Sequence, residues 1–174
     1  GNDSPLAIMS EKSPLLFNYF KQLFAQVSNP PLDAIREELV TSTRSMIGSE
    51  QNLFDETAEH CRQLTITEPV LTNEELEKIR GIEVNGIRTK TLSTLFDVES
   101  GDTLRQAMDR LCGEASQAIE DGYSILILSD RGVDRDRAPI PSLLAISGVH
   151  HHLIREGTRT KVGIVVESGE AREV

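Results

Sequence analysis

The C-terminal half of the sequence alternates between short apolar runs and helical spacing, and this alternation limits the folds available to it. Residues 88–96 are rich in Thr, Leu and Phe and are predicted to form a strand. Tyr123–Leu128 and Val162–Val166 are continuous apolar runs, typical of strands that are buried on both faces. Three strands are therefore predicted within residues 86–174.

Helices are predicted in the two intervals between these strands. Asp102 is placed to cap the first helix and Gly122 to close it, with Leu, Met, Ala and Ile on one stripe. Ser142 is placed to cap the second helix, which Gly157 ends. Strands joined by helical crossovers run parallel, so about residues 86–174 are predicted to form a parallel βαβαβ unit in an α/β fold.

The N-terminal part, about residues 1–85, is predicted to be mainly helical. After the Ser13–Pro14 start signal, Leu and Phe recur at helical spacing until Pro30 and Pro31, which cannot continue a helix.

Later signals extend this prediction. Asp33 is placed to cap a second helix that reaches Ile47 and ends at Gly48, followed by a short helix within 57–64 and an extended stretch over 65–71. Thr72, with Glu75 three residues on, forms a capping box that opens a helix over residues 73–80.

Composition excludes several classes of function. The chain has 28 acidic and 18 basic residues, a formal net charge of -10, which argues against nonspecific nucleic-acid binding. Its apolar runs are too short to span a bilayer, and its N-terminus shows no signal peptide, so no membrane association is expected. Cys61 and Cys112 make no disulfide framework, and a reduced cytoplasmic protein is predicted.

Carboxylates follow the predicted strands, at the edge where α/β proteins form their sites. Asp130, Asp134 and Glu167 could together hold a divalent cation, because such ions prefer oxygen ligands. One hypothesis is therefore a self-contained metal-dependent α/β enzyme that uses this acidic rim. The alternative is a solvated rim whose charges are balanced by arginines such as Arg131.

Other chemically suggestive residues carry weaker signals. His150, His151 and His152 are consecutive, so a helix cannot direct all three to one face, and His150 is predicted to be a packed side chain. Cys112 has no histidine near it in the sequence that would activate it. The rigid loop from Asn29 to Asp33 is either a helix–helix corner or a surface that lines a passage or docks a partner.

Several long stretches are distinctive and run from one end of the chain to the other. They include an entry segment, an FKQLFAQVSNPPLD segment, and three later segments reading LILSDR, PIPSLLA and VHHHLIR; these are residues 1–7, 20–33, 126–131, 139–145 and 149–155. These stretches resemble the central domain of glutamate synthase. Motifs of this length are far more specific than a short pattern.

The resemblance implies a non-catalytic domain, a rudimentary TIM-barrel-like relative of the FMN barrel, cut from a longer chain. It would link a glutaminase domain to an FMN-binding 2-oxoglutarate synthase domain and help form the ammonia passage between them. FMN and a 3Fe-4S cluster would belong to the parent enzyme, with no catalytic, cofactor or metal residue here. The candidates for the passage wall or a domain interface are Asn29, Pro30, Pro31, Asp33 and Arg36.

Overall fold

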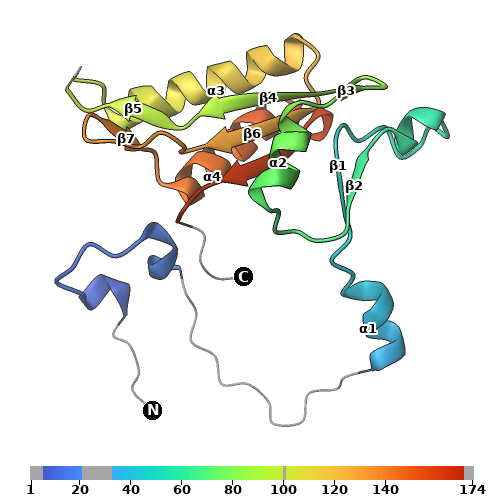
Figure 1. Cartoon of the computed structure of the whole chain (residues 1–174), viewed down its shortest axis with the longest axis horizontal. Helices are drawn as coiled ribbons and strands as arrows, with labels where there is room; N and C mark the ends of the chain where they lie inside the picture. The colour runs from blue at the N-terminus through green and yellow to red at the C-terminus, as the bar shows by residue number, and fades with distance from the viewer. Residues whose placement is uncertain (1–5, 21–32, 100, 171–174) are drawn as a thin grey trace.

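The structure is a computed structural model that describes residues 6–20, 33–99 and 101–170. Its helices and strands follow one another as drawn in Figure 1. The N-terminal elements are η1 (Ala7–Met9), η2 (Leu16–Tyr19), α1 (Ala34–Val40), β1 (Ser45–Ile47), η3 (Ala58–Cys61), β2 (Leu64–Ile66) and α2 (Asn73–Arg80). The C-terminal elements are β3 (Glu83–Val84), β4 (Ile87–Ser93), β5 (Leu95–Asp97), α3 (Leu104–Glu120), β6 (Ile125–Ser129), β7 (Arg137–Pro139), α4 (Ser142–Arg155), η4 (Arg159–Lys161) and β8 (Gly163–Glu167).

The central sheet confirms the predicted parallel βαβαβ unit. Its strand order is β3-β4-β6-β8, in which β6 pairs in parallel with both β4 and β8, while β3 joins β4 as an antiparallel neighbour. All five residues of β6 are buried, as the continuous apolar run predicted. Helix α3 connects β4 to β6 and α4 connects β6 to β8, so both crossovers are helical.

Alternate residues of β6 supply two separate hydrophobic clusters, one on each face of the sheet. Leu126 and Leu128 point into a core shared with α3 and α4. Ile125 and Ile127 point the other way and pack against α2. The molecule therefore has three layers, with α3 and α4 on one face and α2 on the other (Figure 1).

The sheet is open, and the described residues form no closed barrel. The single strand predicted over residues 88–96 is divided at Thr94, whose backbone N–H and hydroxyl both donate to the Ser129 carbonyl. Beyond that point β5 leaves the sheet and pairs with β7 in a separate antiparallel ribbon.

The N-terminal part is less helical than predicted. Asp33 does cap α1, but the helix ends at Val40 and does not reach Ile47. A run of Thr and Ser follows, which has low helix propensity, and Ser45–Ile47 then pairs as β1 with β2. In the region predicted as a short helix at 57–64, the structure has the 3-10 turn η3 and the start of β2. The helix predicted after Pro14 begins as the 3-10 turn η2, and its continuation lies outside the described residues.

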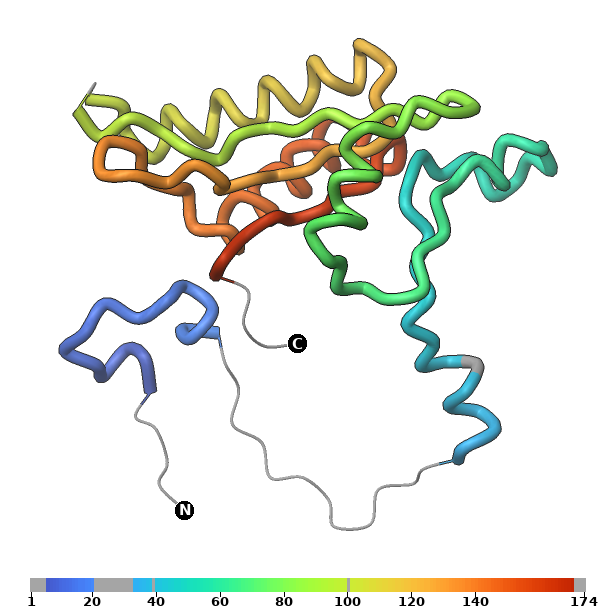
Figure 2. The backbone as a smooth tube through the Cα atoms, in the orientation of Figure 1, coloured from blue at the N-terminus to red at the C-terminus, as the bar shows by residue number. Residues whose placement is uncertain are grey.

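The β1–β2 hairpin lies against the end of the sheet near Gly163. Gly163 opens β8, and a Cβ atom at this position would lie 2.3 Å from Ile47 Cγ2 and 2.9 Å from Gly48 N. The Glu50 N–H also donates to the Thr160 carbonyl at 2.7 Å. The backbone tube in Figure 2 shows the hairpin beside the sheet and α1 extending away from it. Glycine at position 163 is thus what allows the hairpin to approach.

Two of the predicted helix caps are wrong by one residue. Thr103, not Asp102, caps α3, where it forms a capping box with Gln106. The N-cap residue of α4 is Pro141, and the Ser142 hydroxyl is buried with no partner among the described residues. The Thr72 capping box on α2 is confirmed.

Candidate functional site

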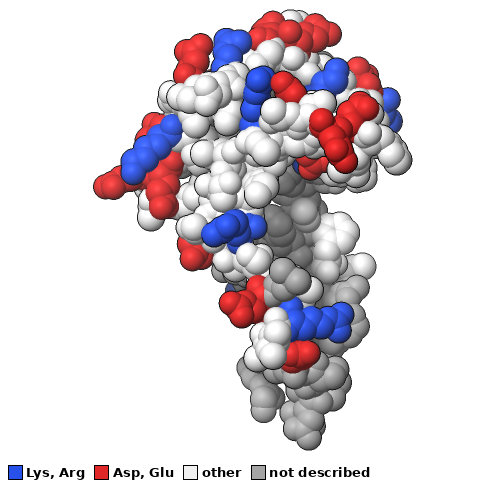
Figure 3. Space-filling view, turned by 90° about the vertical axis from the view of Figure 1, so that its right-hand side faces the viewer, with Lys and Arg blue, Asp and Glu red and all other residues white. Residues whose placement is uncertain are grey.

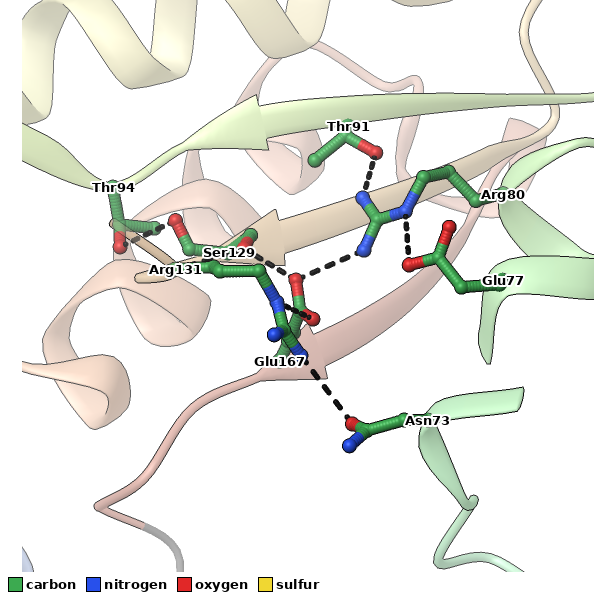
Figure 4. Close-up of polar contacts among 8 residues, drawn as sticks. All are labelled: Asn73, Glu77, Arg80, Thr91, Thr94, Ser129, Arg131 and Glu167. Carbon is green, nitrogen blue, oxygen red and sulfur yellow. Dashed lines mark hydrogen bonds and ion pairs between the residues drawn. The ribbon is translucent and has the colours of Figure 1, made fainter. Parts of the chain in front are cut away.

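The carboxyl edge of the parallel sheet is organised around Glu167, the last residue of β8. Its Oε1 accepts from Arg131 Nε at 2.6 Å, and its Oε2 accepts from Arg80 Nη2 at 3.0 Å and from Ser129 Oγ at 2.5 Å. Figure 4 shows the three donors converging on this one carboxylate from α2, the end of β6 and the loop after β6. Both of its oxygens are therefore engaged.

Arg80 extends the network across the α2 face of the sheet. Besides Glu167 it donates to Thr91 Oγ1 on β4 at 2.6 Å and to Glu77 Oε1 at 3.1 Å (Figure 4). Arg131 reaches the first turn of α2 through a 3.3 Å hydrogen bond to Asn73 Oδ1. Arg80 and Arg131 thus join α2 to β4, to β8 and to the loop after β6. Their charges are balanced by Glu167 and Glu77.

The environment keeps Glu167 ionised. Burial by itself raises the pKa of this carboxyl, but hydrogen bonds from Ser129, Arg131 and Arg80, together with the charge of Arg80, outweigh burial and leave the pKa below its usual value. Burial lowers the pKa of Arg80, and its carboxylate partners more than compensate, so that this pKa is raised. An ionised carboxylate held by this many donors is a poor general base, and the arrangement acts as a structural tie.

The carboxylates predicted to form a metal-binding rim are separately engaged. Asp130 Oδ2 accepts from Ser168 Oγ at 2.7 Å, while Asp134 Oδ2 accepts from Arg137 Nε at 2.9 Å. Glu167 is held by arginines, as described above. No three His, Cys, Asp or Glu side chains within the described ranges are grouped so as to hold a metal ion. Within the described residues, Asp130, Asp134 and Glu167 are therefore not brought together as the predicted metal-binding rim.

The segment after β8 closes the same edge. The Glu170 carboxylate accepts from the Ser142 N–H at 2.7 Å, so a residue distant in sequence supplies the anion at the start of α4. The Ser168 hydroxyl, besides donating to Asp130, accepts from the Glu170 N–H at 3.1 Å. Residues 167–170 consequently fasten α2, β6 and α4 together.

Two of the five predicted passage residues, Asp33 and Arg36, fall within the described part of the chain. Asn29, Pro30 and Pro31 are outside the described residues. Asp33 Oδ1 accepts from the N–H groups of Ile35 and Arg36 at 3.1 and 3.3 Å, and Arg36 is exposed on α1. Helix α1 lies well away from the sheet in Figure 1, so the structure does not bring Asp33 and Arg36 to the carboxyl edge.

Two of the histidines form hydrogen bonds within the fold, His150 with Arg159 and His152 with Ser116. His150 Nδ1 accepts from Arg159 Nε at 2.9 Å, and burial together with the Arg159 charge lowers the His150 pKa. His152 Nε2 bonds Ser116 Oγ at 2.9 Å, which joins α4 to α3. Burial raises the pKa of the Cys112 thiol, which agrees with the prediction that it is not an activated nucleophile. Cys61 is exposed on η3.

Sequence reasoning missed the parts played by Arg80 and Ser129. Each position carried a local signal, since Arg80 ends the helix that the Thr72 capping box opens and Ser129 ends the buried run of β6. Their common partner lies 87 and 38 residues further along the chain, so only the folded arrangement identifies it.

On the face drawn in Figure 3, acidic and basic side chains are interspersed with uncharged surface, and they form no continuous basic patch. No helix in the described part of the chain is both long enough and apolar enough to cross a membrane.

Fold and site together define an open parallel α/β domain whose carboxyl edge is closed by internal ion pairs. A family model, the glutamate synthase central domain, matches residues 1–174. The chain belongs to this family, as the resemblance in its motifs indicated.

Glutamate synthases whose names give three different electron donors, NADPH, ferredoxin and NADH, are similar to this chain. The glutamate synthase [NADPH] large chain of Bacillus subtilis is 47% identical over 174 residues, covering 100% of this chain and 11% of the relative. The ferredoxin-dependent glutamate synthase of Pyropia yezoensis is 43% identical over 98% of this chain and 11% of its own length. The glutamate synthase [NADH] of Schizosaccharomyces pombe is 41% identical over 100% of this chain and 8% of its own length. The chain thus spans about a tenth of the length of these relatives.

Proposed function

We propose that the chain is the non-catalytic central domain of a glutamate synthase, which links the glutaminase domain to the FMN-binding 2-oxoglutarate synthase domain. In this role it helps to form the passage by which ammonia moves between the two sites during glutamate biosynthesis. Family membership and the small share of each relative that the chain spans support its place in a longer polypeptide.

The observation that carries this proposal is the state of the carboxyl edge. In α/β enzymes this edge holds the reacting groups. Here the acid at the centre of the edge, Glu167, gives both oxygens to Arg80, Arg131 and Ser129. Groups that are fully occupied with one another stiffen the edge but offer a substrate nothing to react with.

The cofactors that the family implies fit poorly with the described residues. A 3Fe-4S cluster is held by several cysteine thiolates that lie close together. This chain has two cysteines, and Cys61 on η3 and Cys112 on α3 are not grouped with other ligands in the described ranges. The FMN and the cluster are therefore assigned by this proposal to other parts of the parent enzyme.

The passage itself is tested at Asn29 in the full-length enzyme. A tryptophan at this position would block a narrow channel lined by the Asn29–Asp33 loop, so glutamine hydrolysis should continue while glutamate formation falls. The measurement is the ratio of glutamine hydrolysed to glutamate formed through the synthase reaction, which should rise well above that of the wild-type enzyme.

A matched control separates blockage from general damage. Asn18→Trp places the same bulk on η2, where Asn18 is exposed, and should leave the ratio unchanged. An unchanged ratio in Asn29→Trp would show that the loop is only a helix–helix corner. Arg36→Ala and Asp33→Ala test the neighbouring candidates by the same ratio.

A further inference from the structure

A second cavity lies at the edge of the sheet where the parallel strands begin, opposite the carboxyl edge. Its volume is about 480 Å³, within the range of about 300–1,000 Å³ that is usual for small-molecule sites. Residues just before β4, β6 and β8 bound it on the sheet side: Gly86, Tyr123, Ser124, Thr160 and Lys161. Residues 49–52, which follow β1, close it on the hairpin side. The cavity therefore lies between the sheet and the hairpin.

Most of the polar groups that line this cavity carry no charge. Hydroxyl and amide groups come from Ser49, Gln51, Asn52, Tyr123, Ser124 and Thr160. Two of the described lining residues are charged, and their signs are opposite: Glu50 and Lys161. A ligand that matches this lining is polar and carries both a positive and a negative group.

Glu50 and Lys161 lie on adjacent segments but leave their charges unused. The Glu50 N–H donates to the Thr160 carbonyl at 2.7 Å, which brings the segment after β1 beside η4. Neither the Glu50 carboxylate nor the Lys161 ammonium group forms an ion pair or hydrogen bond within residues 6–20, 33–99 and 101–170. Both charges are thus available to a ligand, in contrast to that of Glu167, which is occupied by arginines.

The sheet side of the cavity is already ordered. Ser124 Oγ accepts from the Arg88 N–H at 3.2 Å, and Arg88 Nη1 donates to the Asp121 carbonyl at 2.9 Å. The guanidinium carbon of Arg88 also lies 4.4 Å from the centroid of the Tyr123 ring, a cation–π contact. Because this wall is fixed in advance, a ligand does not lose affinity by ordering it.

We propose that this cavity binds a polar α-amino acid, with its carboxylate on Lys161 Nζ and its ammonium group on the Glu50 carboxylate. Charge-assisted hydrogen bonds of this kind are about twice as strong as neutral ones. The hydroxyl and amide groups of the lining hold the side chain of the ligand. Since Glu50 follows the hairpin and Lys161 precedes β8, the bound amino acid also clamps the hairpin to the sheet. This site is an addition to the proposed linking function, because the charges of the cavity alone define its ligand.

The test is amide hydrogen exchange in the full-length enzyme, resolved to single residues, with L-glutamate as the probe and no other substrate present. The Glu50 N–H joins the hairpin side to η4, so the clamp should slow its exchange. A ligand that binds only the closed form multiplies protection by 1 + [L]/Kd, which gives about tenfold slowing at about 10 mM for a Kd of about 1 mM. An unchanged rate at this concentration would overturn the proposal.

Two analogues test the two charges of the ligand separately. Glutarate lacks the ammonium group, and 4-aminobutanoate lacks the α-carboxylate. Each should slow the Glu50 amide by no more than about twofold at the same concentration, because one of the two charged contacts is missing. Protection by glutarate equal to that by L-glutamate would indicate a plain anion site and overturn the proposal.

Lys161→Met and Glu50→Gln test the two charges of the cavity. Both side chains are exposed, so each variant should fold. Each should raise Kd at least about tenfold, which reduces the protection of the amide at position 50 to about twofold. The controls are Lys78→Met and Glu74→Gln, which remove the same charges from exposed positions on α2, outside the cavity, and should leave protection intact.

Two comparisons separate this site from the rest of the enzyme. Full protection in both Lys161→Met and Glu50→Gln would mean that the effect is transmitted from another site for L-glutamate, and would overturn the proposal. The ratio of glutamine hydrolysed to glutamate formed in Asn29→Trp is measured independently of exchange at Glu50. Failure of the ammonia passage and failure of the amino-acid site are therefore told apart.

Discussion

The two parts of the molecule differ in how far their apolar side chains are buried. Every buried hydrophobic side chain of the described residues lies at Leu76 or later in the chain. Most of the large hydrophobic side chains that are exposed lie before that point, including Phe20, Ile35, Leu53 and Phe54. Residues 76–170 therefore supply all of the fully buried core, whereas residues 6–71 add only partly buried side chains at its margin, Ile47, Leu64 and Leu71.

The difference indicates where each part gets its stability. Burying an apolar side chain contributes about 1.5–3 kcal/mol, so the sheet and its three helices are stabilised from within. The N-terminal part presents its apolar groups to the surroundings, and clustered exposed groups of this kind mark interaction surfaces. This is the pattern expected of a domain whose first part lies against other domains, in line with the proposed linking function.

The largest expected effect comes from truncating the same residue type in each part. Leu111 on α3 is 1% exposed, and Leu111→Ala should lower the free energy of unfolding by about 3 kcal/mol through lost burial and a residual cavity. Leu53 is 91% exposed, and Leu53→Ala should change it by less than about 0.5 kcal/mol. Urea unfolding followed by circular dichroism compares them, and similar losses would contradict the comparison.

The next effect concerns the tie between α2 and the sheet. Glu167→Gln keeps the size of the side chain but leaves Arg80, which is 26% exposed, without its ionic partner. Breaking a fully buried pair costs about 3–5 kcal/mol, and the partial exposure here reduces the expected loss to about 2 kcal/mol. The control is Glu77→Gln, because the Glu77 side chain is 62% exposed and its loss should be much smaller.

The same variant has a predictable pH dependence. The pKa of Glu167 is lower in the folded chain than its ordinary value of 4.5, so its ionisation favours the folded state above that pH. This contribution is lost as the pH falls through the folded-state pKa. The difference in unfolding free energy between the wild type and Glu167→Gln should therefore shrink below about pH 4.5, whereas a difference that is constant down to pH 2 would show that the charge is irrelevant.

A third effect tests how the N-terminal hairpin is held. Gly163→Ala puts a methyl group where Ile47 Cγ2 and Gly48 N already lie, so the hairpin must move away from β8. The expected cost is about 1–2 kcal/mol, with faster proteolysis within residues 41–68. Gly113→Ala on α3 is the control, since nothing lies within 4 Å of its added Cβ and alanine favours the helix. Unchanged proteolysis in Gly163→Ala would mean that the hairpin is not held by this contact.

The part of the fold that sequence could predict is the part with strong periodicity. The run Tyr123–Leu128 predicted β6 almost to its ends, and the two helical stripes predicted α3 and α4, because local pattern and burial agree there. The resemblance in long motifs likewise identified the family.

The rest depended on contacts between distant residues. Ser45–Ile47 reads as the end of a helix but becomes a strand because β2 lies beside it. Ser142 looks like a cap, yet Glu170 supplies the anion at α4 from the far end of the chain. The acidic rim was predicted to be available for a metal because Arg80, which pairs with Glu167, lies 87 residues earlier in the sequence. Nothing near Glu167 in the sequence indicates this ion pair. Such pairings are set by the tertiary fold, and the local sequence does not identify the partner.

The smallest expected effect compares the two helix caps that sequence did identify. Thr72 opens α2, which buries Leu76 and Ile79, whereas Asp33 opens α1, where Ile35 is 86% exposed. Thr72→Ala should lower the free energy of unfolding of the sheet by about 1 kcal/mol, because α2 is part of its core. Asp33→Ala removes an equally well-placed cap but should leave that free energy unchanged and lower only the helix content of α1.

Residue-resolved hydrogen exchange and urea unfolding separate these outcomes. Faster exchange confined to α1 in Asp33→Ala, with an unchanged unfolding midpoint, would sharpen the comparison, because it would show that α1 is not coupled to the core. A shift of the midpoint in Asp33→Ala as large as that in Thr72→Ala would break it. The N-terminal part would then share the stability of the sheet, and its exposed apolar side chains would have to be explained without assigning that part to a neighbouring domain.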